Sequence, residues 1–372
     1  MSVFGLIEIS FLDLSIILRL AENSLMHQEV GEFVKSQFQS RSVIKYQDII
    51  VTPGCASAID AIAFSICDEE EGILISQPLY NGFNFDLQNR SNVQVVGVKY
   101  QGIEGYTQLD DLFKPGVNRR ALRNALAQAG QKGIPIRALL ISNSHLPVSS
   151  LPTDEYIQPP ETLKEFAAFC GENDLHLISD EIYAFSVFDN PEIPAAVPFR
   201  LVLSLYLDKL IDPRFLHVLY GASKDFCVNG LQMGFDLSWS PHLLQDVWAA
   251  MLEDRHWMES FMLQKKRLML ERYETVTRFL SRHGIPYFEM NAGLFLWIDL
   301  RHLLVSKSTV RHADYNSLRV TSSSSQANLE LEIKITEICG KNGVMIAPGH
   351  VYMAEEFGWF RITFTVGEDA LS

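Results

Sequence analysis

The segment Ser223-Lys224-Asp225-Phe226 places a lysine directly after an apolar stretch of the chain. Residues 217–220 are expected to form a buried strand, and Gly221-Ala222 a tight turn that follows it. A Ser-Lys pair by itself is most often a surface feature. An ammonium at the end of a buried strand, however, is unfavourable unless it is desolvated for a purpose or covalently engaged. Lys224 is therefore a candidate to form a Schiff base with an aldehyde.

A carboxylate and a tyrosine follow another apolar stretch, residues 175–179. Asp180 closes this stretch, and ligand sites of α/β proteins lie at the carboxyl ends of their strands. An aldehyde cofactor with a pyridine ring, pyridoxal phosphate (PLP), needs an anion at its ring nitrogen and benefits from a donor at its ring oxygen. Asp180 and Tyr183 could supply both. The alternative for Asp180 is that it caps the N-terminus of a helix.

Three further features could bind parts of such a ligand. Cys55 and Ala56 open a predicted helix after Gly54, and free N–H groups at a helix N-terminus suit a phosphate. Tyr80 follows the predicted strand 72–76 and could stack on a flat ring, although a packed loop tyrosine is the simpler interpretation of it alone. Arg361 alternates with apolar residues, and its guanidinium fork fits a carboxylate.

The elements that must position these residues alternate between strand and helix as far as residue 220. Such alternation predicts a parallel sheet that is covered by helices on both faces. The predicted strands are 48–51, 72–76, 93–98, 138–141, 175–179 and 217–220, and the predicted helices are 55–67, 118–131 and 160–173.

The pattern changes near residue 240, which predicts a smaller α+β unit. Residues 241–283 are expected to be helical with a break near Glu253-Asp254, and the strands 293–300, 344–346 and 360–364 follow. We therefore divide the chain into an N-terminal helical arm (1–45), a large cofactor-binding domain (46–240), and an interdomain helix with a small C-terminal domain (241–372). Lys265-Lys266-Arg267 is expected to be a solvated helix face.

Three other segments carry simpler expectations. Residues 306–327 are rich in Ser, Thr and Asn and predict a loop. The proline-rich residues 190–200 predict a surface connection. Residues 1–20 predict an amphipathic helix that packs on the body, with a signal peptide as the alternative.

Composition excludes several classes of function. The chain has 372 residues and a formal net charge of −14, so it lacks the basic surface that nucleic acid or an anionic membrane requires. Its five cysteines form no CxxC pair, and its histidines show no metal-ligand spacing. We expect no metal, no disulfide framework and a reducing, cytoplasmic location.

Taken together, these motifs resemble PLP enzymes of fold type I, in the class I/II aminotransferase family. They are most similar to the branch of 1-aminocyclopropane-1-carboxylate (ACC) synthase and its fungal ACC-synthase-like members. The matching segments run in the family's order from about residue 20 to 367, and they are residues 20–23, 52–57, 78–83, 179–183, 220–226, 229–231, 291–295 and 360–361.

This resemblance implies a role for each candidate residue. Lys224 would hold the cofactor and move the substrate's proton, while Asp180 would pair with the ring nitrogen and Tyr183 would bond the ring oxygen. The remaining implied contacts are Tyr80 on the ring face, Ser223 with the N–H groups of Cys55 and Ala56 on the phosphate, and Arg361 on the substrate carboxylate. The implied fold has a mixed, mostly parallel sheet between helices, and the implied assembly is a homodimer.

The sequence also departs from the family pattern. Leu146 stands where an asparagine normally bonds the ring oxygen, Gln232 where an arginine pairs with the phosphate, and Gly221 where a hydroxyl residue is common. Residues 34–45 join two elements that the family separates by several tens of residues, including a tyrosine that reaches the neighbouring subunit. A decayed or repurposed paralogue and a truncated gene model are both open explanations.

The resemblance implies an aminotransferase that acts on an amino acid and a 2-oxo acid. Biosynthesis of a secondary metabolite is the expected setting for this activity. An ACC-synthase-like or C–S lyase is the first alternative, and a catalytically impaired paralogue is the second. An unrelated nucleotide-binding protein is disfavoured because no GxGxxG or Walker pattern follows a predicted strand.

Overall fold

The computed structural model describes residues 24–41, 44–45, 48–143, 159–193, 200–228, 242–305, 320 and 325–367. The predicted helix at residues 1–20 lies outside the described residues, as do Leu146, Gln232 and most of the predicted loop 306–327.

Within the residues that the structure describes, a five-stranded parallel sheet is the larger of the two sheets. Its strands lie in the order β2-β1-β3-β4-β5, and every neighbouring pair is parallel. All five residues of β1 are buried, as expected for a parallel strand that is covered on both faces. The bounds are β1 (Gly72–Ser76), β2 (Gln94–Val98), β3 (Ile136–Ser142), β4 (His176–Asp180) and β5 (Leu216–Leu219).

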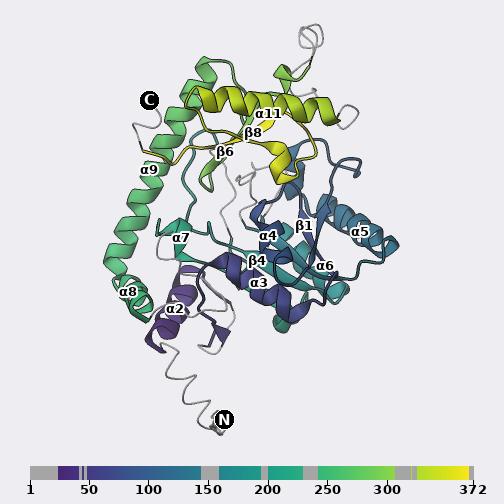
Figure 1. Ribbon diagram of the computed structural model, residues 1–372. Coiled ribbons are helices and arrows are strands. Elements are labelled where there is room, and N and C mark those ends of the chain that lie inside the picture. The colour runs from purple at the N-terminus through teal and green to yellow at the C-terminus, as the bar shows by residue number, and fades with distance from the viewer. Residues whose placement is uncertain are drawn as a thin grey trace, which may run out of the picture.

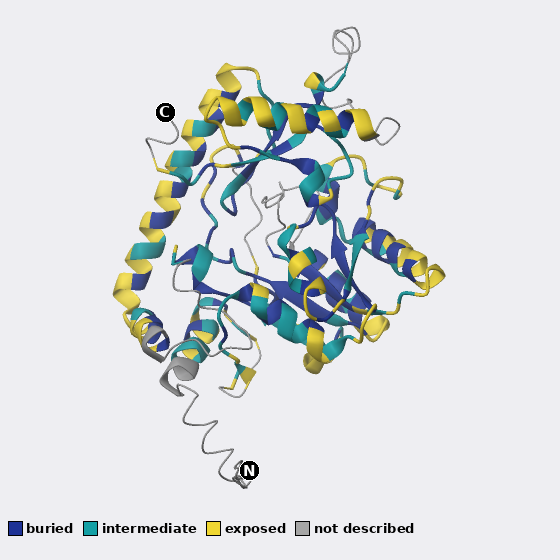
Figure 2. Cartoon of the chain, viewed as in Figure 1, coloured by how far each residue is buried: buried dark blue, intermediate teal, exposed yellow. Residues whose placement is uncertain are grey.

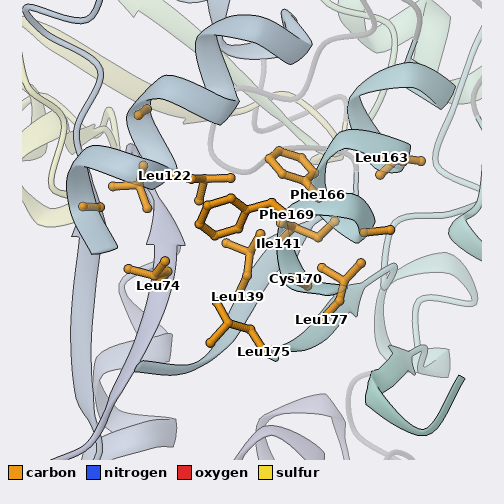
Figure 3. Close-up of a cluster of buried hydrophobic side chains, with 14 of the residues drawn as sticks. Leu74, Leu122, Leu139, Ile141, Leu163, Phe166, Phe169, Cys170, Leu175 and Leu177 are labelled. Carbon is orange, nitrogen blue, oxygen red and sulfur yellow. The ribbon is translucent and has the colours of Figure 1, made fainter. Parts of the chain in front are cut away.

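Helices cover both faces of this sheet, and alternate residues of the central strand β3 show which face is which. Leu139 and Ile141 pack in one apolar cluster with α5 (Pro115–Gln131) and α6 (Pro159–Glu172), shown in Figure 3. Ala138 and Leu140 point the other way and pack with α3 (Cys55–Ile66) and α4 (Gly82–Gln88). The carboxyl ends of all five strands therefore share one edge between two helical layers.

A smaller antiparallel sheet is formed near the end of the chain. Its strands are β6 (Phe295–Asp299), β7 (Ala347–Pro348) and β8 (Trp359–Thr363), in the order β6-β8-β7. One face packs against α9 (Arg255–Arg282) and α11 (Ser325–Lys341). In Figure 2 the outward sides of these helices are exposed, while the strands beneath them are largely buried.

The long helix α9 connects the two parts of the structure. Asp254 accepts a hydrogen bond from the Trp257 N–H at its start, which separates α9 from α8 (His242–Glu253) at the predicted break. In Figure 1, α9 runs along one side of the molecule from α8 to the level of α11. Helix α2 (Ser24–Gln37) lies against α8, and the single-turn helix α7 (Ala222–Asp225) follows β5. Short 3₁₀ helices complete the described elements: η2 (Leu109–Phe113), η3 (Val202–Ser204), η4 (Pro213–Phe215), η6 (Arg301–Leu303) and η9 (Gly349–Tyr352).

The predicted fold class is confirmed, with local corrections. Residues 48–51 are not a strand, because the N–H and carboxylate of Asp48 bond back to Lys45 in a turn. Residues 344–346 are not a strand either, since the Val344 N–H bonds the Cys339 carbonyl at the end of α11 and only residues 347–348 pair with β8. The helices α4, α7 and α11 were not predicted: α7 begins at Ala222, where a turn was expected, and α11 begins inside the predicted loop.

The remaining points about the fold concern its domain division and its apolar helices. The division into an arm, a large domain and a small domain stays a prediction. In the part of the chain that the structure describes, no helix is both long and apolar enough to cross a membrane.

Candidate active site

Lys224 lies on α7, one turn beyond the carboxyl end of β5. Its side chain is half-buried, and within the described residues no carboxylate forms an ion pair with it. Burial, together with the positive charge of Arg361, lowers the pKa of its ammonium, while Asp180 and Cys55 act in the opposite direction. The site therefore favours a neutral amine at Lys224 more than water does.

Asp180 ends β4, the strand next to β5, and its side chain is buried. One carboxylate oxygen accepts the N–H of Ile182 at 3.2 Å. Burial, with a smaller contribution from the nearby Asp86, raises the pKa of Asp180 to about 7, and the Ile182 N–H and the Lys224 ammonium act in the opposite direction. The helix-cap alternative is wrong, because residues 181–185 form turns and no helix begins there. A buried carboxylate with one backbone donor leaves room for a second donor.

Tyr183 is buried beside Asp180 and reaches toward the smaller sheet. Its ring meets that of Phe295 on β6 edge to face, with 6.2 Å between the ring centres. Burial and the charge of Asp180 raise the pKa of its hydroxyl, while Arg361 lowers it. Tyr183 is thus a protonated donor that lies between Asp180 on the large sheet and Arg361 on the small one.

The N-terminus of α3 lies near Lys224 and Asp180. Its first N–H groups have no partner inside the helix, and the preceding Gly54 supplies no side-chain cap. Gly54 has φ 101°, and a β-carbon built there would meet nothing within 4 Å, so open space lies in front of it. The Cys55 thiol is buried and has a raised pKa, first from burial and next from the charge of Asp180, which Lys224 offsets. Cys55 and Ala56 therefore start the helix next to the Lys224–Asp180 pair.

Tyr80 lies two residues before α4 and interacts electrostatically with Asp180 and Arg361. Its ring folds over Gly82, where an added β-carbon would lie only 2.2 Å from a ring carbon. The ring contacts Phe83 edge to face and remains 41% exposed. Tyr80 is thus only partly packed, and one ring face remains available for a planar ligand.

Arg361 lies on β8 opposite Trp297 of β6. Its guanidinium carbon is 3.9 Å from the ring centre of Phe295 and 4.5 Å from that of Tyr352. Burial lowers its pKa, and no carboxylate in the described ranges forms an ion pair with it. A half-buried cation that is held between two rings is well placed to bind an anion from outside.

The structure brings the candidate residues together from both sheets. Lys224 interacts electrostatically with Asp180, Arg361 and Cys55, and Arg361 also interacts with Tyr183 and Tyr80. Ser223, half-buried, precedes Lys224 on α7, and Ala56 follows Cys55 on α3.

Some residues at this site were not foreseen. Asp86, half-buried on α4, interacts with Asp180, Cys55 and Tyr80, and burial raises its pKa to about 6. No sequence signal marked it, because α4 was missed. Phe295 was within a matching segment, although its contact with Arg361 requires the register of β6 and β8.

A separate hollow adjoins this site between the two sheets. Its walls include Gln77, Pro78, Trp297, Trp359 and Arg301, and in the described chain they do not include the Lys224 cluster. The guanidinium of Arg301 is already paired with Asp299 and Glu356. Within the described residues, the walls of this hollow therefore include neither Lys224 nor Arg361.

Comparison with protein families gives a match over nearly the whole chain. Residues 23–371 match the family described as aminotransferase class I and II. A relative from Takifugu rubripes, 1-aminocyclopropane-1-carboxylate synthase-like protein 1, is 29% identical over 360 residues, which cover 92% of this chain and 52% of that protein. This chain thus spans about half the length of that relative.

Two other relatives have different descriptions. A mouse protein, probable inactive 1-aminocyclopropane-1-carboxylate synthase-like protein 2, is 26% identical, with 91% of this chain and 55% of that protein covered. The probable aminotransferase gliI of Aspergillus fumigatus is 28% identical, with 92% of this chain and 76% of that protein covered.

Solved structures show a similar fold. The aspartate aminotransferase from Thermus thermophilus with maleate superimposes with a TM-score of 0.66 at 16% identity, covering 94% of this chain and 80% of that one.

Proposed function

This chain belongs to the aminotransferase class I and II family, and we propose that it transfers the amino group of an amino acid to a 2-oxo acid. Enzymes of this family depend on PLP. The observation that carries the proposal is the convergence of Lys224, Asp180 and Arg361, from two sheets, at the carboxyl edge of the larger one.

The residues present fit PLP. Asp180 is buried without an ion-pair partner in the described chain, and a protonated ring nitrogen would supply one. Open space lies before the N-terminus of α3, where a phosphate would accept the unpaired N–H groups. Lys224 offers an amine whose pKa is lowered by burial, which an aldehyde requires.

Each residue has a proposed part in holding the group. Asp180 would keep the ring nitrogen protonated, and the Tyr183 hydroxyl would donate to the ring oxygen. Tyr80 would cover one ring face. The N–H groups of Cys55 and Ala56, together with the Ser223 hydroxyl, would donate hydrogen bonds to the phosphate.

The chemistry follows from that arrangement. Bound PLP supplies an electron sink that acidifies the α-proton of an amino acid. The Lys224 amine, with its lowered pKa, then takes and returns this proton. Arg361 orients the substrate by its α-carboxylate, and its partly buried site strengthens that contact.

Replacing Arg361 by glutamine tests this orientation. A charge-assisted bond to a carboxylate contributes about 1.5–3 kcal/mol, so KM for the amino donor is expected to rise about 10- to 100-fold. The matched control is Arg267→Gln, which changes an exposed arginine on α9. Steady-state kinetics are measured with an amino acid and with the corresponding amine, which lacks the carboxylate. A loss that is confined to the amino acid shows that Arg361 acts on the carboxylate. Equal losses for both substrates would contradict the assignment.

The direct test of the reaction is a screen of amino-acid donors with the purified protein and PLP. A transaminase converts the donor to its 2-oxo acid only when a 2-oxo acid acceptor is present. Product formation that is independent of an acceptor, with release of ammonia, a thiol or ACC, would contradict transamination and support a lyase. The similarity to an ACC-synthase-like protein is the observation that favours this second candidate.

A catalytically impaired paralogue is the remaining candidate. Gln232 replaces a cation expected at the phosphate and Leu146 an amide expected at the ring oxygen, and one relative is described as probably inactive. The loss of one charge-assisted bond weakens PLP binding by about 1.5–3 kcal/mol, or one to two decades in Kd. Titration with PLP tests this candidate: a Kd weakened by about one to two decades, or no binding at all, supports impairment, and tight binding contradicts it.

A homodimer is proposed for the assembly. Two packed helices near the site, α3 and α4, each expose a phenylalanine: Phe64 is 57% exposed and Phe85 is 64% exposed. Exposed aromatic rings of this kind are common in subunit interfaces. Light scattering coupled to size-exclusion chromatography is expected to give twice the 42.1 kDa chain mass, and a monomer at micromolar concentration would contradict the proposal.

A further inference from the structure

A buried ion pair holds the turn that carries Lys224. Asp225, the next residue, is fully buried at the end of α7. One of its carboxylate oxygens accepts the Phe185 N–H at 2.9 Å, and the other accepts the Ser186 hydroxyl at 2.6 Å. The latter oxygen also accepts the Lys265 ammonium at 2.7 Å. The hydroxyls of Tyr183 and Tyr220 are the other titratable groups that face this carboxylate.

The partner cation comes from α9, far away in the sequence. Lys265 is 8% exposed, and its ammonium also donates to the backbone carbonyl of Asp225 at 3.0 Å. It therefore holds both the backbone and the side chain of the residue that follows Lys224. The expectation that Lys265 belongs to a solvated helix face is wrong, although the adjacent Lys266 and Arg267 are exposed.

Lys265 also lies at a particular place along α9. The helix residues before it, including Met258 and Phe261, pack in a cluster with Phe226 of the Lys224 turn. The residues after it, including Met269 and Tyr273, pack in the cluster that contains the strand of Arg361. Thus one straight helix contacts the turn of Lys224 with its first half and the strand of Arg361 with its second half, as the course of α9 in Figure 1 shows.

We propose that the Lys265–Asp225 pair is a positioning clamp that fixes the Lys224 turn to α9 and thereby sets where Lys224 lies relative to Arg361. The part that concerns catalysis rests on the proposed function. The physical reason is that a short helix of four residues is not stable by itself, so its position depends on tertiary contacts. The clamp supplies buried, charge-assisted contacts to two other elements.

The test uses the full chain, first without cofactor. Lys265→Met removes the cation and leaves a buried carboxylate that lacks its counter-ion, so this variant can fail to fold. The double variant Lys265→Met with Asp225→Asn removes both charges. Its amide oxygen can still accept the Phe185 N–H, and its amide NH2 can donate to the Ser186 hydroxyl in place of the bond that the carboxylate accepts, so it is the decisive protein. Arg267→Met, which breaks an exposed ion pair two residues away on the same helix, is the matched control.

Two readouts do not depend on catalysis. Amide hydrogen exchange, read by mass spectrometry, is expected to be at least about tenfold faster at residues 222–228 of the double variant, with α5 unchanged. The midpoint of the pH profile for acylation of Lys224 is expected to rise, because a looser turn is better solvated. Arg361, Asp180 and Cys55, the titratable groups that act on the pKa of Lys224, are the same in every variant.

Kinetics complete the test where the wild-type protein turns over. A misplaced lysine is expected to lower kcat at least about tenfold, with a smaller change in KM. Wild-type exchange at residues 222–228 in the folded double variant would overturn the clamp. Faster exchange with an unchanged acylation profile would overturn its effect on Lys224 and leave a purely structural pair. If the wild-type protein fails to bind PLP, the proposed function falls, while exchange and acylation still decide the clamp.

Discussion

Replacement of Lys224 by alanine is expected to abolish measurable turnover, with a loss of at least about 10³-fold in kcat. The side chain has two proposed tasks, to hold the aldehyde carbon of the cofactor and to move the α-proton of the substrate. General acid–base catalysis alone contributes about 10²–10⁴-fold. The pKa of the amine is lowered by burial and by Arg361, which suits a group that must accept a proton near neutral pH.

The control for this prediction is Lys266→Ala, because Lys266 is an exposed lysine on α9. Both variants are to be compared by circular dichroism and by kcat with the best amino donor. A small primary amine added to the Lys224→Ala protein is expected to restore part of the lost rate, since it replaces the missing base. Turnover within tenfold of wild type in the Lys224→Ala protein would show that another residue performs the proton transfer.

Replacement of Asp180 by asparagine is expected to have opposite effects on turnover and on stability. Turnover should fall about 10²–10³-fold, because the asparagine amide cannot stabilise a positive ring nitrogen as a buried carboxylate does. The cofactor-free variant should nevertheless be more stable than wild type near pH 8, by on the order of 2 kcal/mol. A buried charge that serves the reaction thus destabilises the empty protein.

The pH dependence gives the sign of this stability effect. Burial raises the pKa of Asp180 from 3.8 in the unfolded chain to about 7 in the folded protein. Between these two pH values the Asp180 carboxyl is ionised in the unfolded chain but still protonated in the folded protein. The free energy of unfolding therefore falls as pH rises toward 7. Urea unfolding without cofactor is therefore expected to show a difference between variant and wild type at pH 8 that disappears near pH 4. A variant that is less stable at pH 8 would contradict the account.

Local patterns in the sequence predicted much of the large sheet and the residues at its edge. Apolar stretches of four to six residues located β1 to β5 closely, because strands that are buried on both faces have few polar residues. Once those strands were parallel, Asp180 and Lys224 had to meet at one edge. The break in the helical region at Asp254 was also predictable, since its side chain caps the next helix.

The rest depended on contacts between distant segments. Whether Lys265 is solvated or buried cannot be decided from its neighbours, because Lys266 and Arg267 have the same charge and are exposed. The contact of Arg361 with Phe295 and Tyr352 depends on the register of the smaller sheet. Residues 48–51 had the composition of a strand, but Asp48 bonds back to Lys45 in a local turn, and these residues pair with no strand in the described chain.

The central claim is that Lys224 holds PLP covalently, and one measurement tests it most directly. The protein is saturated with PLP, reduced with borohydride, digested and mapped by mass spectrometry. A phosphopyridoxyl group on Lys224 in near-stoichiometric yield, with Lys265 and Lys266 unmodified, is the predicted result. A visible cofactor band that disappears on reduction without any label on Lys224, or a label spread over exposed lysines, would contradict the claim.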